Sequence, residues 1–329
     1  MPEVKMGTIV RWQKLSPILA TFCLAPENGN RFPEYEAGQY MALRRERCRL
    51  TRPVVGADGR RRYVADVDAS GNPRVGPVTH SYSVASAPCQ SRRQGCLEFY
   101  IVLERDAEGT PGRLTGSLFE HDAPARAELG YVNRITGNFT LAKRAAGFEH
   151  VLLVGTGTGV APFLSMIRQL HFEASRGQGA TGVRYTLIHA NRTYQELAHH
   201  EELAAIEAGR RFDFVYIPSV SRPTARDFDD PGLGRGRANN LLRLIFDMPL
   251  KEEQVLQEVS ARGEDPARAR AALDRATVPA LPRHLARREL EQRLDPSRTV
   301  ILTCGNPSLM ADIGHIAGLH RIHFEKEDW

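Results

Sequence analysis

The sequence predicts two domains, an N-terminal antiparallel β-barrel and a doubly wound parallel α/β domain. A chain of 329 residues can form two domains of ordinary size. Up to about residue 145, short β-type segments are separated by turns, as in antiparallel barrels. After about residue 150, strand-like and helix-like segments alternate, which is typical of a parallel sheet. We therefore expect domains at residues 1–147 and 148–329.

The barrel half contains evenly spaced β-type segments and one helical stretch. The helix is predicted over residues 112–120, and Asp58-Gly59 has the composition of a hairpin turn between arginine-rich arms. The strands are expected at 7–12, 18–24, 40–43, 81–86 and 97–103.

The second half alternates regularly between the two element types. Strands are expected at 151–154, 185–189, 212–220 and 299–304, and helices at 160–172, 195–208, 238–246 and 307–319. Residues 249–296 are charged, rich in alanine and mostly helical in pattern. We interpret this stretch as an inserted helical segment that serves structure or partner contact.

Composition narrows the class of protein. Hydrophobic residues make up 42% and charged residues 25%, as in globular proteins. The longest apolar run, 151–164, is broken by three glycines and a proline, so no membrane span is expected. The N-terminus lacks the pattern of a signal peptide. Five cysteines without CxxC spacing predict a reducing, cytoplasmic setting and no iron–sulfur cluster within this chain.

One segment is strongly basic. Between Arg44 and Arg62 there are eight arginines against Glu46 and Asp58. No aromatic residues alternate with them, which argues against nucleic-acid binding. An acidic protein partner or a nucleotide phosphate fits this charge better, and a solvated basic loop is the structural alternative.

The glycine-rich motif that follows the first predicted strand of the second half indicates a phosphate site. The strand leads into Gly155, Gly157 and Gly159, interleaved with Thr156 and Thr158, and then into a helix with Pro162 in its first turn. Glycines let the backbone approach a pyrophosphate, and a helix N-terminus favours negative charge. The spacing differs from the G-x-G-x-x-G motif of the common dinucleotide fold.

Further candidates follow later strands of the same predicted sheet. Arg192 and the pair Ser221-Arg222 come directly after strands, and Arg237 precedes a helix. The carboxyl edge of a parallel sheet is where ligands bind, and several guanidinium groups there would suit a dianionic phosphate, favouring NADPH over NADH. The last strand brings Cys304 and Gly305 to this edge; a buried cysteine that only packs is the alternative reading.

The combined motifs resemble those of the ferredoxin–NADP(H) reductase family, most closely the bacterial ferredoxin/flavodoxin reductases. The shared motifs are HSYSVASAP at residues 80–88, LEFYIV at 97–102, GRLT at 112–115, GTGTGVAP at 155–162, the strand ends HANR, SVSR and LTCGNP, and the C-terminal Trp329. The resemblance covers most of the chain except insertions at about 44–78 and 249–296. It implies a flavin-dependent oxidoreductase that exchanges electrons between NADPH and a small carrier protein, ferredoxin or flavodoxin.

The resemblance also implies roles in flavin binding. Tyr82 would stack on the flavin ring and Ser83 would hydrogen-bond its N5 edge. FAD is expected rather than FMN, because Trp329 would pack against an adenine. The family usually has arginine where this chain has His80, so the diphosphate is expected to rely on a nearby arginine such as Arg113. Besides Tyr82 and Ser83, the residues that would hold the flavin are His80, Val84, Tyr100, Ile101, Val102, Gly112, Arg113, Leu114 and Thr115.

On the nucleotide side, the resemblance implies that Gly155–Pro162 would cradle the NADPH pyrophosphate. Arg192, Arg222 and Arg237, with Ser221, would bind the 2′-phosphate, and Cys304 would border the nicotinamide, where Gly305 leaves room. An NADH-dependent reductase component of an oxygenase system and a non-catalytic flavin-binding subunit are the alternatives. The histidine clusters at 199–200 and 315–323 follow no known ligand spacing, so no metal site is predicted.

Overall fold

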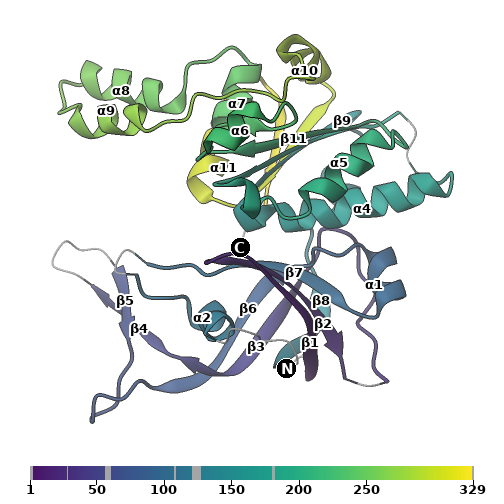
Figure 1. The fold of residues 1–329 in the computed structure, drawn as a ribbon, viewed down its shortest axis with the longest axis vertical. Coiled ribbons are helices and arrows are strands. Elements are labelled where there is room, and N and C mark those ends of the chain that lie inside the picture. The colour runs from purple at the N-terminus through teal and green to yellow at the C-terminus, as the bar shows by residue number, and fades with distance from the viewer. Residues whose placement is uncertain are drawn as a thin grey trace. The chain divides into compact units, whose positions relative to one another are not determined.

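The structure is a computed structural model that describes residues 3–27, 29–55, 61–106, 109–120, 127–179 and 182–327. The chain divides into two compact units. Unit 1 comprises Met1–Thr140 and Leu164–Met166, and unit 2 comprises Leu141–Phe163 and Ile167–Trp329. Each unit has its own sheet (Figure 1).

Unit 1 is built on a curled six-stranded antiparallel sheet with the order β6-β3-β8-β1-β2-β7. Its two edge strands meet through a bridge between Val84 and Phe99, so the sheet bends into the predicted barrel form. Apolar side chains such as Phe22, Phe99 and Tyr131 fill the interior. The strands are β1 (Val4–Ser16), β2 (Leu19–Pro26), β3 (Tyr40–Arg49), β6 (Val75–Ser83), β7 (Leu97–Val102) and β8 (Glu128–Thr136), with helices α1 (Pro88–Gln94) and α2 (Arg113–Phe119).

The arginine-rich segment of unit 1 forms strands. β3 continues to Arg49, well past the predicted end at residue 43, because Arg44, Arg45 and Arg49 pair with β6, with a register shift between Arg45 and Cys48. Beyond it, β4 (Thr51–Val55) and β5 (Arg61–Ala65) form a separate two-stranded antiparallel sheet. The predicted turn residues Asp58-Gly59 lie outside the described residues.

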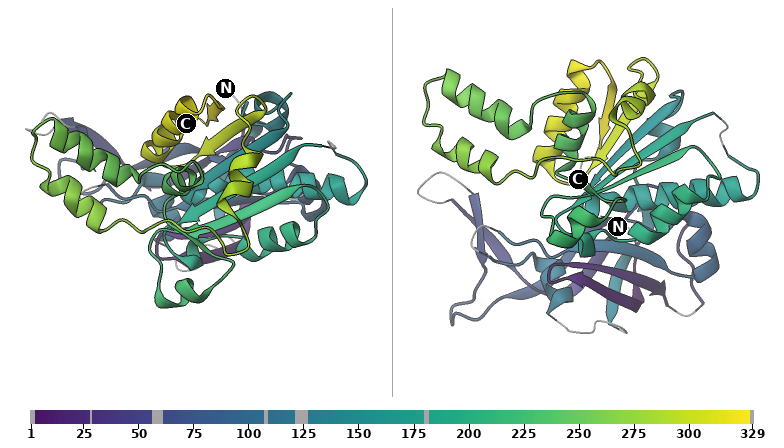
Figure 2. Two further views of the ribbon diagram at one scale, coloured as in Figure 1. Left: turned by 90° about the horizontal axis from the view of Figure 1, so that it is seen from above. Right: turned by 45° about the horizontal axis from the view of Figure 1, so that its top comes forward.

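Unit 2 is a six-stranded parallel sheet with the order β12-β11-β10-β9-β13-β14, as predicted for this half. Helices α7, α10 (Arg287–Arg293) and α11 bury apolar side chains on one face, and α4 and α5 lie on the other (Figure 2). The strands are β9 (His150–Thr156), β10 (Arg184–Asn191), β11 (Phe214–Val220), β12 (Gly234–Arg235), β13 (Thr299–Cys304) and β14 (His323–Lys326). The helices are α3 (Leu141–Arg144), α4 (Ala161–Ser175), α5 (His200–Ala208), α6 (Ala225–Asp229), α7 (Ala238–Ile245) and α11 (Pro307–Leu319), with 3₁₀ turns η1 (Gly157–Val160) and η2 (Tyr194–Glu196).

The segment predicted as a helical insertion forms α8 (Lys251–Ala261), α9 (Ala267–Asp274) and α10 (Arg287–Arg293). A buried ion pair connects the elements beside it: Arg243 of α7 has no exposed side-chain surface and binds Asp312 of α11 at 2.7 Å. Arg243 also donates to Gln254 of α8 at 2.8 Å. No helix within the described ranges has both the length and the apolar character needed to cross a bilayer.

Candidate functional site

The end of β6 in unit 1 carries the predicted aromatic and hydroxyl pair. Tyr82 is half-buried against the barrel core, and burial raises the pKa of its phenol well above the usual range. Ser83 is 5% exposed, and its Oγ has no hydrogen-bond partner among the described residues. A buried hydroxyl of this kind is costly unless a ligand pairs with it. Ser83 therefore fits a polar ring edge held over Tyr82.

Neighbouring elements bring other predicted residues to this region of unit 1. α2 packs on β3 and β6, and β6 meets β7. Tyr100 and Ile101 are buried in β7, Val102 is half-buried beside them, and Val84 is fully buried at the edge. At the start of α2, Leu114 and Thr115 are buried and Gly112 is the N-cap.

His80 and Arg113 are close enough to interact electrostatically. His80 is exposed on β6, and its pKa is lowered by partial burial and by the charge of Arg113. Since its ordinary pKa is already near 6.5, the imidazole is neutral at pH 7. Arg113 makes no hydrogen bond or ion pair within the described residues. Of these two residues, only Arg113 has a positive charge that could bind a diphosphate.

In unit 2, the glycine-rich motif forms a compact strand–turn–helix junction. Gly155 and Thr156 end β9, residues Gly157–Val160 form a single 3₁₀ turn, and α4 begins at Ala161 with Pro162 in its first turn. Gly157 has φ +58°, a conformation that glycine adopts without penalty. The junction thus brings the first N–H groups of a 15-residue helix to the carboxyl edge of the sheet.

The end of β13 packs directly on this junction. A Cβ on Gly159 would lie 2.2 Å from the carbonyl oxygen of Cys304, and one on Gly305 would lie 2.2 Å from Thr156 Oγ1. Gly305 also has φ +128°. The Asn306 N–H donates to Thr156 Oγ1 at 2.9 Å. Only glycine permits this approach, so the structure brings together the predicted residues of both strand ends.

Cys304 is fully buried, and its thiol has an acidic partner. Its Sγ donates to Glu327 Oε2 at 3.1 Å, and Glu327 is itself 6% exposed. The Glu327 N–H donates to the Thr303 carbonyl at 3.0 Å. A thiol and a carboxylate are therefore paired at the carboxyl end of β13. Trp329, predicted to contact the flavin, lies outside the described residues.

The three predicted phosphate-binding arginines differ in their partners. Arg192 forms a two-point ion pair with Glu196, whose side chain is almost fully buried. Arg237, the N-cap of α7, binds Glu252 of α8 at 3.0 Å. Arg222 is exposed, and no ion pair or hydrogen bond within the described ranges engages its guanidinium group. Arg222 is thus the best placed of the three to meet an external anion.

Part of unit 2 matches a known protein family, and both units share their fold with solved structures. Residues 153–239 match the family model described as the oxidoreductase NAD-binding domain. Superposition on solved structures extends the likeness to both units. The chain has the fold of the ferredoxin–NADP+ reductases. No curated protein sequence matches the chain.

Three solved structures illustrate this fold. A ferredoxin NADP+ reductase from Neisseria gonorrhoeae, solved with FAD and NADP, is 20% identical with a TM-score of 0.57, and the match covers 99% of each chain. The flavohem-like FAD/NAD binding domain of nitric oxide dioxygenase from Vibrio cholerae is 16% identical (TM-score 0.56, 98% of each chain). The cytochrome b5 reductase domain of Ulva prolifera nitrate reductase is 13% identical (TM-score 0.54, 99% of this chain and 97% of that one).

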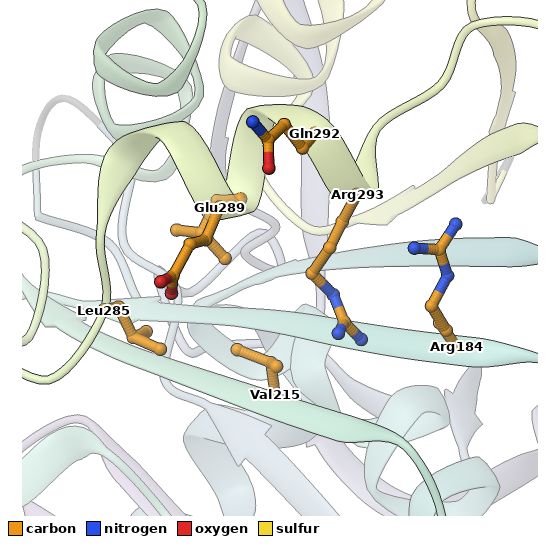
Figure 3. Close-up of a pocket in the computed structure, with 7 residues that line it drawn as sticks. Arg184, Val215, Leu285, Glu289, Gln292 and Arg293 are labelled. Carbon is orange, nitrogen blue, oxygen red and sulfur yellow. The ribbon is translucent and has the colours of Figure 1, made fainter.

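A cavity of about 260 Å³ also lies in unit 2, on a different part of the reductase-like fold (Figure 3). It is lined in part by Arg184, Val215, Glu289 and Arg293, and Arg184 and Val215 stand at the amino-terminal ends of β10 and β11. The glycine-rich junction is at the opposite, carboxyl ends of the strands. The cavity is also smaller than most cofactor sites, so we do not assign the nucleotide to it.

Several residues at the candidate site were not predicted from the sequence. Glu196 stands four residues after Arg192, but the segment between them is a 3₁₀ turn and not an α-helix, so the pairing rule for helices does not predict this contact. Glu252 and Glu327 are far in sequence from their partners, and no local pattern marks them. Among the described residues, no three potential metal ligands of the His, Cys, Asp and Glu types gather in one place.

Proposed function

We propose that this chain is a flavin-dependent oxidoreductase that passes a hydride between NADPH and FAD, and single electrons between FAD and a small acidic carrier protein, ferredoxin or flavodoxin. The observation that carries the proposal is the end of β6, where the buried Ser83 Oγ, which has no hydrogen-bond partner in the part of the chain that the structure describes, follows the half-buried ring of Tyr82. The domain match at residues 153–239 and the fold support the nucleotide part.

FAD, when bound, would supply the two-electron and one-electron chemistry that no side chain provides. In this proposal, Tyr82 packs on the flavin ring and the Ser83 hydroxyl donates a hydrogen bond to its edge. Arg113 at the start of α2 neutralises charge on the diphosphate, a role that the neutral imidazole of His80 leaves to it. Tyr100–Val102 and Gly112–Thr115 hold the remainder through backbone contacts.

For the nucleotide, the proposal assigns the pyrophosphate to residues Gly155–Pro162 and the 2′-phosphate to Arg222, with Ser221 beside it. Arg192 and Arg237 would flank that phosphate while paired with their own carboxylates. Gly305 leaves room for the nicotinamide, and the Cys304 thiol, held by Glu327, borders it. The domain limits of 1–147 for FAD and 148–329 for NADP(H) belong to the same proposal.

The absorption spectrum of the purified full-length protein tests the proposal. We expect a flavin spectrum, or its appearance after incubation with FAD, and bleaching on anaerobic titration with NADPH. Titration with FMN in parallel checks the choice of flavin. A protein that stays colourless after incubation with either flavin would refute the proposal, and a flavin that no pyridine nucleotide reduces would favour a non-catalytic flavin-binding subunit.

The second candidate is an NADH-dependent reductase component of an oxygenase system. The observation that favours it is the ion pair between Arg192 and Glu196, because the carboxylate neutralises one of the arginines expected at the 2′-phosphate. Equal rates of flavin reduction by NADH and NADPH would support this candidate over the first.

A further inference from the structure

The segment that follows α9 in the helical insertion packs on the edge of the parallel sheet in unit 2. Arg235 of β12 and Ala280 form an antiparallel bridge with hydrogen bonds of 2.8 and 2.9 Å. The Arg283 N–H donates to the Pro231 carbonyl at 2.8 Å. A Cβ on Gly236 would lie 3.0 Å from Pro279 Cα, so the two backbones are in close contact. The insertion therefore extends the sheet beyond β12.

The same segment contacts the loop that carries Arg222. Thr277 Oγ1 donates to the carbonyl oxygen of Ser221 at 2.7 Å. On the other side of this loop, the Ser221 N–H donates to the Asn191 carbonyl at 2.9 Å, and the Arg222 N–H donates to the Arg192 carbonyl at 2.8 Å. The backbone of Ser221-Arg222 is thus held from both sides, by the end of β10 and by the insertion.

The position of Arg222 matters because its guanidinium charge is not neutralised by a carboxylate within the described residues. Arg192 and Arg237 already have carboxylate partners, whereas Arg222 is exposed and retains its charge for an external anion. The partner of Arg237 is Glu252 of α8, which also belongs to the insertion. The insertion therefore contacts two of the three segments that bear the predicted phosphate ligands.

We propose that Thr277 is a positioning residue for recognition of a ribose 2′-phosphate. Its hydroxyl holds the Ser221 carbonyl, which fixes the direction in which the Arg222 side chain leaves the backbone. The ligand class is a phosphomonoester dianion on an adenosine ribose, and the inference rests on the proposed use of NADPH. A hydroxyl-to-carbonyl bond at the loop is enough to change affinity without entering the site.

Calorimetric titration of the full-length protein with adenosine 2′,5′-bisphosphate and with 5′-AMP tests this inference without relying on turnover. We expect Thr277→Val to raise the dissociation constant for the bisphosphate about 3- to 10-fold, the value of one net hydrogen bond, and to leave 5′-AMP binding unchanged. Thr277→Ser keeps the hydroxyl and should restore most of the affinity. The control is Thr299→Val, since Thr299 Oγ1 in β13 has no hydrogen-bond partner within the described residues.

The outcomes separate the inference from the proposed function. If the wild-type protein prefers the bisphosphate and Thr277→Val binds it equally well, the positioning role is wrong and the use of NADPH stands. If Thr277→Ser is as weak as Thr277→Val, the hydroxyl is not responsible and the inference fails. If the wild-type protein binds the bisphosphate no better than 5′-AMP, NADPH specificity fails and the inference fails with it.

Discussion

Arg192, Arg222 and Arg237 differ in how much charge each retains for a ligand, although all three follow or precede elements at the carboxyl edge of one sheet. A guanidinium group in a two-point pair with a carboxylate has satisfied much of its hydrogen-bonding capacity. Arg192 is in that state with Glu196, and Arg237 shares one contact with Glu252. Selectivity for a phosphorylated ribose should therefore depend mainly on Arg222.

Replacement of that arginine gives the first prediction. We expect Arg222→Ala to lower kcat/KM for NADPH about 10- to 100-fold, because a charge-assisted hydrogen bond to phosphate contributes roughly 1.5–3 kcal/mol, while kcat/KM for NADH changes little. Steady-state kinetics with both nucleotides measures this. Arg176→Ala, which removes an exposed arginine stacked on Phe172 at the end of α4, is the control. An equal loss with NADH and NADPH would contradict the assigned role.

The sequence predicts those site residues that belong to a local motif. The glycines at 155, 157 and 159 and the pair Cys304-Gly305 were predicted as separate motifs, and the structure shows why glycine is needed where they meet. Thr277 and Glu327 could not be found in this way. Each contacts a residue more than 20 positions away, and no periodic or spacing pattern encodes such pairings.

Among the elements, the arginine-rich strands of unit 1 have an exposed surface with both charged and apolar side chains. Arg47 and Arg52 are exposed and make no ion pair within the described residues, whereas Arg44 is paired with Glu46. Val55 is 74% exposed on β4 and Tyr63 is 50% exposed on β5. Two strands alone bury little surface. This combination fits the proposed contact with an acidic carrier.

Charge reversal on these strands tests that contact. We expect the double variant Arg47→Glu/Arg52→Glu to raise KM for an acidic ferredoxin or flavodoxin roughly 5-fold or more at low ionic strength, with a smaller difference at high salt because of screening. Reduction of ferricyanide should not change. The matched control is Arg268→Glu/Arg270→Glu, which makes the same charge change on α9. A salt-independent effect, or the same effect from the control, would place the carrier elsewhere.

The helices of unit 2 are joined by a buried polar network. Asp312 of α11 accepts from Arg243 at 2.7 and 2.9 Å and from Asn239 at 2.9 Å. Burial alone would raise the pKa of Asp312, but the hydrogen bonds from Arg243 and Asn239, together with the charges of Arg243 and Lys251, outweigh it and lower the pKa. The carboxylate is therefore charged and compensates the fully buried guanidinium group.

Removing that carboxylate leaves Arg243 buried without its counter-charge. We expect Asp312→Ala to reduce the free energy of unfolding by about 3–5 kcal/mol, measured by denaturant titration. The apolar double variant Arg243→Met/Asp312→Leu should recover most of that loss, because neither charge then remains buried. Glu149→Ala, which breaks the exposed pair with Arg298, is the control and should change little. Comparable losses from Asp312→Ala and Glu149→Ala would show that burial is not the cause.

The alternation of strands and helices after residue 150 was predictable, because fully buried parallel strands have continuous apolar runs such as that of β9. The end of β3 was not predicted. Its residues 44–49 are mostly arginine, which has no strong strand signal, and pairing with β6, together with the Arg44–Gly130 pair to β8, makes them a strand. The two-residue strand β12 is also too short for any periodic signal.

For the molecule as a whole, buried neutral histidines contribute to the way stability depends on pH. His150 of β9 has no exposed surface, and its Nδ1 donates to the Arg293 carbonyl at 2.6 Å while Nε2 accepts from Thr186 at 2.9 Å. Burial lowers the pKa of His150 to about 4. Burial likewise lowers the pKa of His189, on the adjacent strand β10, to about 3. Both rings are neutral in the folded protein.

Acid should therefore destabilise the protein in a defined range. The unfolded chain binds a proton near pH 6.5 and folded His150 only near pH 4, so its stabilising contribution is complete above pH 6.5 and is lost as pH falls towards 4. The loss should be about 3 kcal/mol for His150. Thermal melts across this range should show a flatter profile for His150→Gln, while His284→Gln, at an exposed position, should follow the wild type. Identical profiles for all three would exclude His150.

The antiparallel bridge between Arg235 and Ala280 also covers part of one edge of the parallel sheet. Strand β12 ends one side of the parallel sheet, and an uncovered strand there would present backbone N–H and C=O groups to other molecules. By pairing with Arg235, Ala280 occupies the N–H and C=O groups that this residue of β12 would otherwise present at the edge. A chain shortened by deletion of the insertion would leave the backbone groups of Arg235 without this partner, and we expect it to self-associate more than the full-length chain does.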